Sequence, residues 1–264
     1  MPWNTTPDAL EAVPRPLTAM ARDLADGETI APHRHGRAQL VYASAGVMTV
    51  NTADGAWLVP PERAVWMPAG VTHWIDCAGT VRMRTLYIRP DAAPALPATC
   101  RVVGVSPLLR HLILRAVDMP SHYDEAGPEG RLVAVILDEL ADLPTAPLHL
   151  AMPRDPRLRR IAEHLLADPG GRETATELAE IGGVSERTMA RLFKQETGLG
   201  LAAWRQQARL MKAVAWLGAG RRVTDCALDL GYESTSAFIA MFRRALGVTP
   251  GRYFQDSDSR LTES

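Results

Sequence analysis

Between Ala179 and Pro250 one sequence pattern occurs twice. It consists of a small residue, a glycine, a serine, two large apolar residues and a second glycine. In order, the two copies are Ala179, Gly183, Ser185, Met189, Phe193, Gly198 and Ala227, Gly231, Ser234, Phe238, Phe242, Gly247. A small residue lets two helices approach closely, and a glycine four positions later can take the positive φ that ends the first helix. The serine can then cap a second helix by accepting a hydrogen bond from a backbone N–H. Each copy therefore predicts a helix-turn-helix.

The flanking sequence predicts the other helices of this C-terminal region. Asp155 followed by Pro156 is typical of a capped helix start. A helix over Leu201–Leu217 has 17 residues and would span about 25 Å. With its ends included, it can hold two recognition helices about one DNA turn, roughly 34 Å, apart. The expected short helices are Thr174–Ile181, Ser185–Glu196, Thr224–Leu230 and Ser234–Ala245.

The net charge also distinguishes the C-terminal region from the rest of the chain. Residues 154–254 hold 16 Lys+Arg and 11 Asp+Glu, a net charge of +5, whereas the remainder holds 13 and 19, a net charge of -6. A basic region that also carries the doubled pattern is suited to a polyanion such as DNA. The N-terminus lacks a basic segment followed by an apolar run, and no apolar stretch approaches membrane-spanning length. We therefore expect a soluble, cytoplasmic protein that does not bind membranes.

The N-terminal part has a β texture. Residues up to about Arg22 hold four prolines and indicate an arm. From Leu24 to Ile88, short runs rich in Val, Thr, Trp and Tyr alternate with Gly, Pro and Asp-Gly turns, which predicts a small barrel or sandwich. Ser106 with Pro107 then begins one helix, and a second runs from about Glu129 to Leu143. The apolar stripes of this pair are either core or a dimer face.

Three histidines and a glutamine are candidates for an effector site. The even spacing of His33, His35 and Gln39 would place them on one face of a continuous strand, and His73 could come from a neighbouring strand. Three imidazoles and an amide oxygen could hold Zn²⁺, Ni²⁺, Fe²⁺ or Mn²⁺ with positions left open for a ligand. Alternatively, they form a polar barrel mouth without metal that hydrogen-bonds a small molecule. The three cysteines, Cys77, Cys100 and Cys226, are too widely spaced to form a disulfide framework or a CxxC metal site.

Two resemblances follow from these residues. Gly27, His33, His35, Gln39 and Gly46, with Pro68, Gly70 and His73, resemble the two motifs of the cupin β-barrel. The sequence departs from those motifs at Glu62, at Cys77 and at Gln39, where the family usually has Gly, Asn and Glu. "LAEIGGVSERTMARLFKQETG" and "VTDCALDLGYESTSAFIAMFRRALGVTPGRY" resemble the DNA-binding domain of AraC/XylS transcription regulators over about 100 residues. The resemblance implies the subgroup with a cupin sensor, some of whose members respond to metals such as nickel or to small toxic compounds.

The two predicted recognition helices carry different side chains on the face away from the core. Arg191 is the candidate for bidentate contact with guanine, and Arg187 for a base or phosphate. The second helix has no long basic reader, so it would supply thymine-methyl, hydroxyl and phosphate contacts. The expected DNA-binding residues are Ser185, Glu186, Arg187, Ala190 and Arg191 on the first helix, and Ser234, Thr235, Ser236, Ala237, Ala240, Arg243 and Arg244 on the second.

These features predict a fold of the α+β multidomain class, with an N-terminal cupin-like β-barrel and an all-α C-terminal domain with two helix-turn-helix units. The expected segments are 1–104 (arm and barrel), 105–143 (helical pair), 144–154 (linker), 155–254 (DNA-binding domain) and 255–264 (tail). We expect a non-enzymatic regulator whose partners are promoter DNA, a metal or small-molecule effector, RNA polymerase if it activates, and a second copy in a homodimer. A metal-dependent cupin dioxygenase or isomerase is the alternative, and a protein-binding scaffold would leave the exposed arginines unexplained.

Overall fold

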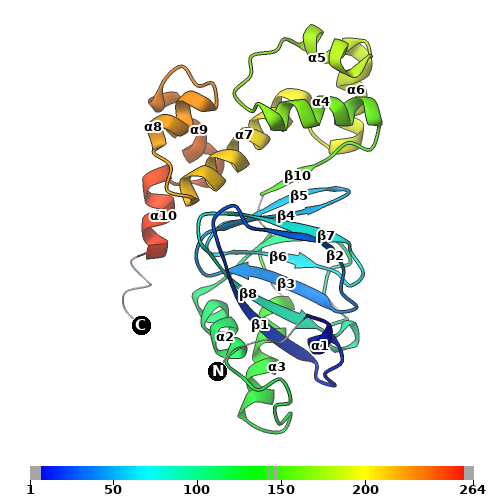
Figure 1. The fold of residues 1–264 in the computed structure, drawn as a ribbon, viewed down its shortest axis with the longest axis vertical. Helices are drawn as coiled ribbons and strands as arrows, with labels where there is room; N and C mark the ends of the chain where they lie inside the picture. The colour runs from blue at the N-terminus through cyan, green and yellow to red at the C-terminus, as the bar shows by residue number, and fades with distance from the viewer. Residues whose placement is uncertain (1–6, 95, 142, 146–147, 259–264) are drawn as a thin grey trace. The chain divides into compact units, whose positions relative to one another are not determined.

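The computed structural model describes residues 7–94, 96–141, 143–145 and 148–258 (Figure 1). The chain forms two compact units, one of residues 1–52 and 57–149 and the other of residues 53–56 and 150–264. Within the described ranges, no helix combines the length and the apolar character needed to cross a bilayer. The predicted class, a sheet-rich cupin-like domain followed by a helical domain, is confirmed. The division into five segments stays a prediction.

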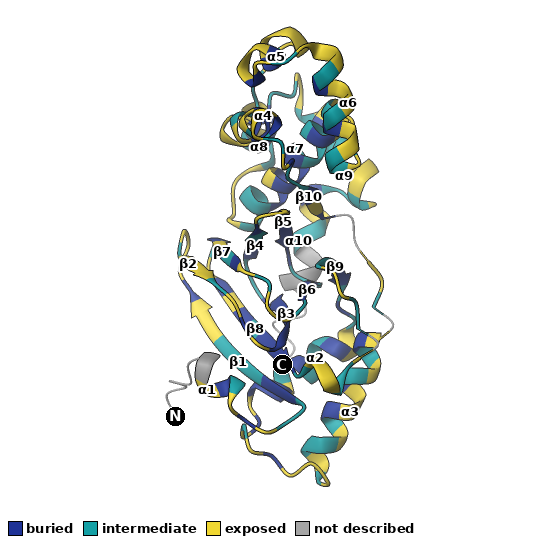
Figure 2. Cartoon of the chain, turned by 90° about the vertical axis from the view of Figure 1, so that its right-hand side faces the viewer, coloured by how far each residue is buried: buried dark blue, intermediate teal, exposed yellow. Residues whose placement is uncertain are grey.

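Two antiparallel five-stranded sheets build the first unit. One sheet has the order β1-β8-β3-β6-β9, and the other β10-β5-β4-β7-β2. Strand β3 is buried and strand β8 is buried except at Arg82 and Arg84, whereas the edge strand β2 is largely exposed (Figure 2). The strand bounds are β1 Leu17–Leu24, β2 Thr29–His33, β3 Ala38–Ala43, β4 Val47–Thr52, β5 Gly55–Val59, β6 Arg63–Met67, β7 His73–Ala78, β8 Val81–Ile88, β9 Arg101–Gly104 and β10 His149–Ala151.

The first sheet has one face toward the barrel interior and the other toward two helices. Because side chains alternate along a strand, Leu40 and Leu86 point to the opposite face from Gln39 and Tyr87. Leu40 and Leu86 join a buried cluster with the apolar faces of α2, Pro107–Val117, and α3, Pro128–Ala141. Figure 1 shows these helices beside β1 and β8. The helical pair therefore buries its main stripes as core of the first unit, although Leu108 is 54% exposed.

Two sequence expectations about irregular segments are wrong in part. The predicted arm contains helix α1, Pro7–Glu11, and strand β1 begins at Leu17 rather than Leu24. The predicted linker contains β10, which pairs with β5. In both cases a partner strand supplies the backbone hydrogen bonds that local periodicity does not reveal. For β1 this partner is β8, paired along the whole strand from Leu17 to Leu24.

The helical unit repeats its caps as the sequence predicts. The Ser185 side chain accepts from the Thr188 N–H, and that of Ser234 accepts from the Ala237 N–H. Gly183 and Gly231 have φ of 67° and 75°. The bounds are α4 Pro156–Ala167, α5 Ala175–Gly182, α6 Glu186–Thr197, α7 Leu201–Gly218, α8 Val223–Asp229, α9 Thr235–Leu246 and α10 Pro250–Asp258. Helix α10 continues into the segment that was expected to be a tail.

Each helix-turn-helix packs its aromatic residues inward. In the first, Phe193 lies edge-on to Trp204 of α7 with ring centroids 5.5 Å apart, and both side chains are fully buried. In the second, Phe238 and Phe242 are fully buried with centroids 6.0 Å apart. Because these inward residues recur about every four positions, the opposite faces of α6 and α9 are exposed to solvent.

Candidate functional sites

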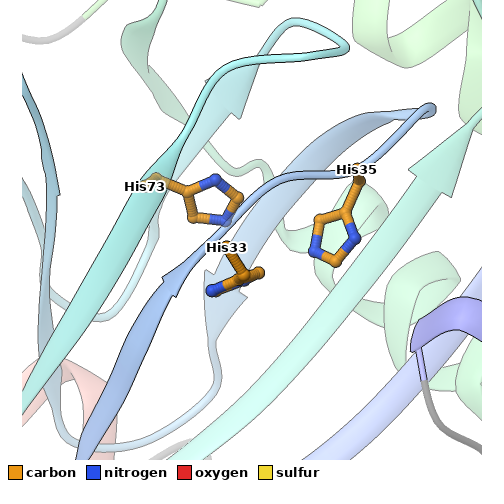
Figure 3. Close-up of side chains that lie close together, drawn as sticks. All are labelled: His33, His35 and His73. Carbon is orange, nitrogen blue, oxygen red and sulfur yellow. The ribbon is translucent and has the colours of Figure 1, made fainter.

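Three histidines meet on the first unit (Figure 3). His33 ends β2 and faces His73, the first residue of β7, in the register of the sheet. His35 lies in the loop that leads from β2 to β3. One ring nitrogen of each of the three lies within 4.8 Å of the others. The cluster is therefore compact enough for one small cation to be shared.

Backbone carbonyls orient two of the three rings. His33 Nδ1 lies 2.7 Å from the Ala31 carbonyl oxygen, and His73 Nδ1 lies 3.0 Å from that of Val71. Since a carbonyl oxygen only accepts, Nδ1 carries the proton in both rings, and Nε2 carries the lone pair that a metal needs. The Nε2 atom of His73 is buried and has no hydrogen-bond partner among the described residues.

The environment keeps His73 neutral. Burial, assisted by the neighbouring His33 and His35 rings and opposed by the Val71 hydrogen bond, lowers the pKa of His73 to about 4. An imidazole must be neutral to bind a metal. His73 is therefore in the ligand form throughout the physiological range.

A carboxylate lies beside the third ring. His35 Nδ1 lies 3.2 Å from Oε1 of Glu11, the last residue of α1, and the His35 side chain is 5% exposed. A histidine that binds a metal through one nitrogen commonly donates its other N–H to a carboxylate or a carbonyl. Sequence reasoning missed Glu11, because nothing in the local pattern of an apparent arm links it to a histidine 24 positions later.

Gln39 does not continue the strand that holds the histidines. Strand β2 ends at His33 and belongs to one sheet, whereas Gln39 lies on β3 in the other. The continuous-strand expectation is therefore wrong, because the chain passes between sheets inside the predicted run. Gln39 is opposite Tyr87 on β8, and its amide is hydrogen-bonded to the Tyr87 hydroxyl. The Tyr87 ring lies 5.0 Å from that of His35, so Gln39 reaches the cluster through this tyrosine.

The donor set suits a transition metal. Three neutral imidazoles are a common ligand set for Zn²⁺, Ni²⁺, Fe²⁺ or Mn²⁺ and leave coordination positions for a small molecule. Each Nδ1 atom already has an oxygen within 3.2 Å. The residues present therefore fit such an ion, and Glu11 adds negative charge beside it.

The predicted DNA-reading residues of the first helix-turn-helix lie on or just before α6. Ser185, Glu186, Arg187, Ala190 and Arg191 are all exposed, on the side away from buried Met189 and Phe193. Arg191 donates to Gln195 Oε1 at 3.3 Å, and this contact is exposed to solvent. The first unit of the doubled pattern thus presents two arginines on one accessible surface.

The second recognition helix presents a different surface. On α9, Ser236, Ala237, Ala240, Arg243 and Arg244 are exposed, as is the cap Ser234, whereas Thr235 is half-buried. The two arginines lie in the last turns of the helix. Short side chains occupy its N-terminal turns, where helix-turn-helix proteins usually contact bases. Figure 2 shows exposed residues along both α6 and α9.

Comparison with known proteins is consistent with this arrangement. Two family profiles match: "AraC-like ligand binding domain" over residues 19–128 and "Helix-turn-helix domain" over residues 178–256. The HTH-type transcriptional regulator NimR of Escherichia coli (strain K12) is 38% identical over 230 residues, which covers 87% of this chain and 82% of that protein. The regulator RipA of Corynebacterium glutamicum is 33% identical over 111 residues, covering 42% of this chain and 32% of that protein.

Two solved structures show weaker likeness. ToxT from Vibrio cholerae, with a bound unsaturated fatty acid, has a TM-score of 0.38 at 10% identity, covering 90% of this chain and 94% of that chain. The DNA-binding domain of AdpA in complex with a target DNA has a TM-score of 0.38 at 26% identity, covering 41% of this chain and 98% of that chain.

Proposed function

The chain belongs to the AraC family of transcriptional regulators, and we propose that its three-histidine cluster binds a divalent transition metal that controls promoter binding. The observation that carries the proposal is the shared arrangement of His33, His35 and His73. Each has Nδ1 beside an oxygen acceptor, and one ring nitrogen of each lies within 4.8 Å of the others. The bound ion would link β2, β7 and the loop after β2, and so stabilise one arrangement of the ligand-binding domain.

On DNA, we assign base reading mainly to α6. Arg191 and Arg187 are exposed and long enough for bidentate contact with guanine in the major groove. On α9, short side chains such as Ser236 and Ala240 would meet thymine methyl groups, and Arg243 would contact phosphate. Specificity is then concentrated on one half of the DNA site.

A metal-free small molecule is the second candidate effector. The described residues include buried side-chain oxygens without a hydrogen-bond partner on the first sheet, namely those of Thr18, Gln39 and Thr85. Thr18 and Gln39 both pair with Tyr87 of β8 and share its face. Buried polar atoms are normally hydrogen-bonded, so this row favours an organic effector with several polar groups.

Other partners belong to the same proposal. The exposed Leu108 of α2 and Val135 of α3 are the apolar positions from which a homodimer would be built. RNA polymerase is a partner if the regulator activates transcription. The regulator would act in the cytoplasm, where the chromosome lies. The relatives named above are transcriptional regulators, which supports regulation rather than catalysis.

The test removes two ligands at once. His33→Ala with His35→Ala should abolish metal retained after reconstitution with Ni²⁺ or Zn²⁺, measured by elemental analysis. His111→Ala with His122→Ala is the matched control, because both of these histidines are exposed and lie outside the cluster. DNA affinity, with and without metal, is measured on sites that the wild type selects from a random-sequence library.

The outcomes separate the candidates. Metal-dependent DNA affinity in the wild type and the control, but not in the cluster variant, supports a metal effector. A wild type that retains no metal refutes it and leaves the small molecule. Retained metal without any change in DNA affinity would make the ion structural rather than regulatory.

A further inference from the structure

We propose that Glu11 is a positioning residue of the histidine cluster: it fixes the Nδ1–H tautomer of His35 and thereby sets the affinity of the cluster for metal. The inference rests on the proposed function, and it adds a residue from the N-terminal segment to the site. It predicts that a carboxylate which touches no metal controls how tightly metal is held.

The carboxylate is held at the point where it can act. Its Oε1 atom lies 3.2 Å from His35 Nδ1 and accepts a hydrogen bond from the Gly36 N–H at 2.8 Å. A Cβ atom on Gly36 would lie 3.3 Å from Glu11 Oε2. The side chain therefore fits closely against two consecutive residues of the loop that carries the ligand.

The next residue of that loop anchors the segment that carries Glu11. Arg37 is 4% exposed. It donates to the carbonyl oxygens of Glu11 at 3.3 Å, of Val13, and of Arg15 at 3.0 Å. Residues 35, 36 and 37 thus each contact the segment from Glu11 to Arg15. The buried Arg37 guanidinium therefore holds the backbone of the segment that carries the Glu11 carboxylate.

His35 is the ligand for which such a partner matters. A neutral imidazole carries its proton on either nitrogen, and the nitrogen that carries it cannot bind a metal. Backbone carbonyls accept from Nδ1 of His33 and His73, whereas for His35 it is the negative charge of a carboxylate 3.2 Å from Nδ1 that favours a proton there. A carboxylate beside one ring nitrogen also makes the opposite nitrogen more basic. Loss of such partners typically weakens metal binding about 10–100-fold.

The experiment measures metal affinity and tautomer on the full chain. Zn²⁺ dissociation constants are obtained by competition with a chromophoric chelator for the wild type, Glu11→Gln and Glu11→Ala. Asp91→Asn is the control. Asp91 is an exposed carboxylate that lies near the same N-terminal segment, but it forms its ion pair with Arg89. Long-range ¹H–¹⁵N spectra of the metal-free proteins report which nitrogen of His35 carries the proton.

We expect Nδ1–H in the wild type, a mixture of tautomers in Glu11→Ala, and a loss of Zn²⁺ affinity of about 10–100-fold. Glu11→Gln should lose less, because its amide oxygen still accepts from Gly36 and keeps a partial negative charge beside His35 Nδ1. Asp91→Asn should match the wild type. Glu11→Gln keeps the contact with Gly36, so it tests the idea even if Glu11→Ala fails to fold.

Several results would overturn the inference. A folded Glu11→Ala with wild-type Zn²⁺ affinity, or with the wild-type tautomer, refutes the positioning role while the metal site stands. A lower melting temperature alone, without a change of tautomer, shows that Glu11 only anchors the segment. A wild type that binds no Zn²⁺ instead refutes the proposed function, and the role of Glu11 falls with it.

Discussion

Gly183 and Gly231 occupy the same place in the doubled pattern, yet alanine should have different effects at the two positions. Both have positive φ, 67° and 75°. A Cβ atom on Gly183 would meet nothing within 4 Å, whereas one on Gly231 would lie 2.4 Å from the carbonyl oxygen of Gly170. A non-glycine residue in the left-handed region costs roughly 1–2 kcal/mol. Overpacking against fixed neighbours adds roughly 1–3 kcal/mol.

Gly183→Ala should therefore lower the free energy of unfolding by about 1–2 kcal/mol, and Gly231→Ala by about 2–5 kcal/mol. Urea titration of the full chain, followed by circular dichroism at 222 nm, gives the difference. Hydrogen exchange of peptides from α5 and α8 shows where the loss is located. The contact is close in both directions, because a Cβ atom on Gly170 would lie 2.2 Å from the carbonyl oxygen of Asp229.

Equal destabilisation by the two variants would refute this reasoning, since only the contact with Gly170 separates them. A nearly neutral Gly231→Ala would show that the loop at Gly170 moves away without cost. Faster exchange in α5 than in α8 for Gly231→Ala would place the effect in the wrong helix-turn-helix.

Three further predictions follow from the structure. Arg191→Ala should weaken binding to selected DNA by about 1–3 kcal/mol, more than Ala240→Arg or Ser236→Ala, as measured by gel-shift titration. The same loss on random DNA would show that Arg191 contacts only phosphate. Ser185→Ala should lower the free energy of unfolding by about 1 kcal/mol in urea titrations, because the Thr188 N–H loses its acceptor. In the metal-free chain, folded His73 stays neutral down to its pKa of about 4, whereas unfolded His73 binds a proton below about 6.5. Stability should therefore fall as pH drops from about 6.5 to 4, by up to about 3 kcal/mol, and His73→Gln should flatten this dependence.

Local chemistry explains what could be predicted from the sequence. The cap at Ser106 and those at Asp155, Ser185 and Ser234 involve an acceptor and an N–H two or three residues apart. A pattern of this length is visible without knowledge of the fold. The histidine cluster could be predicted for a related reason. His33, His35 and His73 stand at positions of the two short cupin motifs, whose spacing is visible in the sequence.

Contacts between distant segments explain what could not be predicted. Glu11 reaches His35 only because Arg37 holds the carbonyls of the N-terminal segment. Gly231 differs from Gly183 only because the loop at Gly170 lies against it. Neither relation leaves a periodic signal, since each depends on where a separate part of the chain is placed by the fold.

Helix α7 limits how the DNA targets of such a protein can evolve. It lies between the two helix-turn-helix units (Figure 1) and is continuous over Leu201–Gly218, 18 residues without proline. An unbroken helix does not stretch, so α7 restricts how far the two helix-turn-helix units can move apart along it. Each base pair inserted between two half-sites turns one of them by about a tenth of a DNA turn. For a protein that contacts both half-sites at once, base substitutions should therefore be tolerated better than insertions and deletions between the halves.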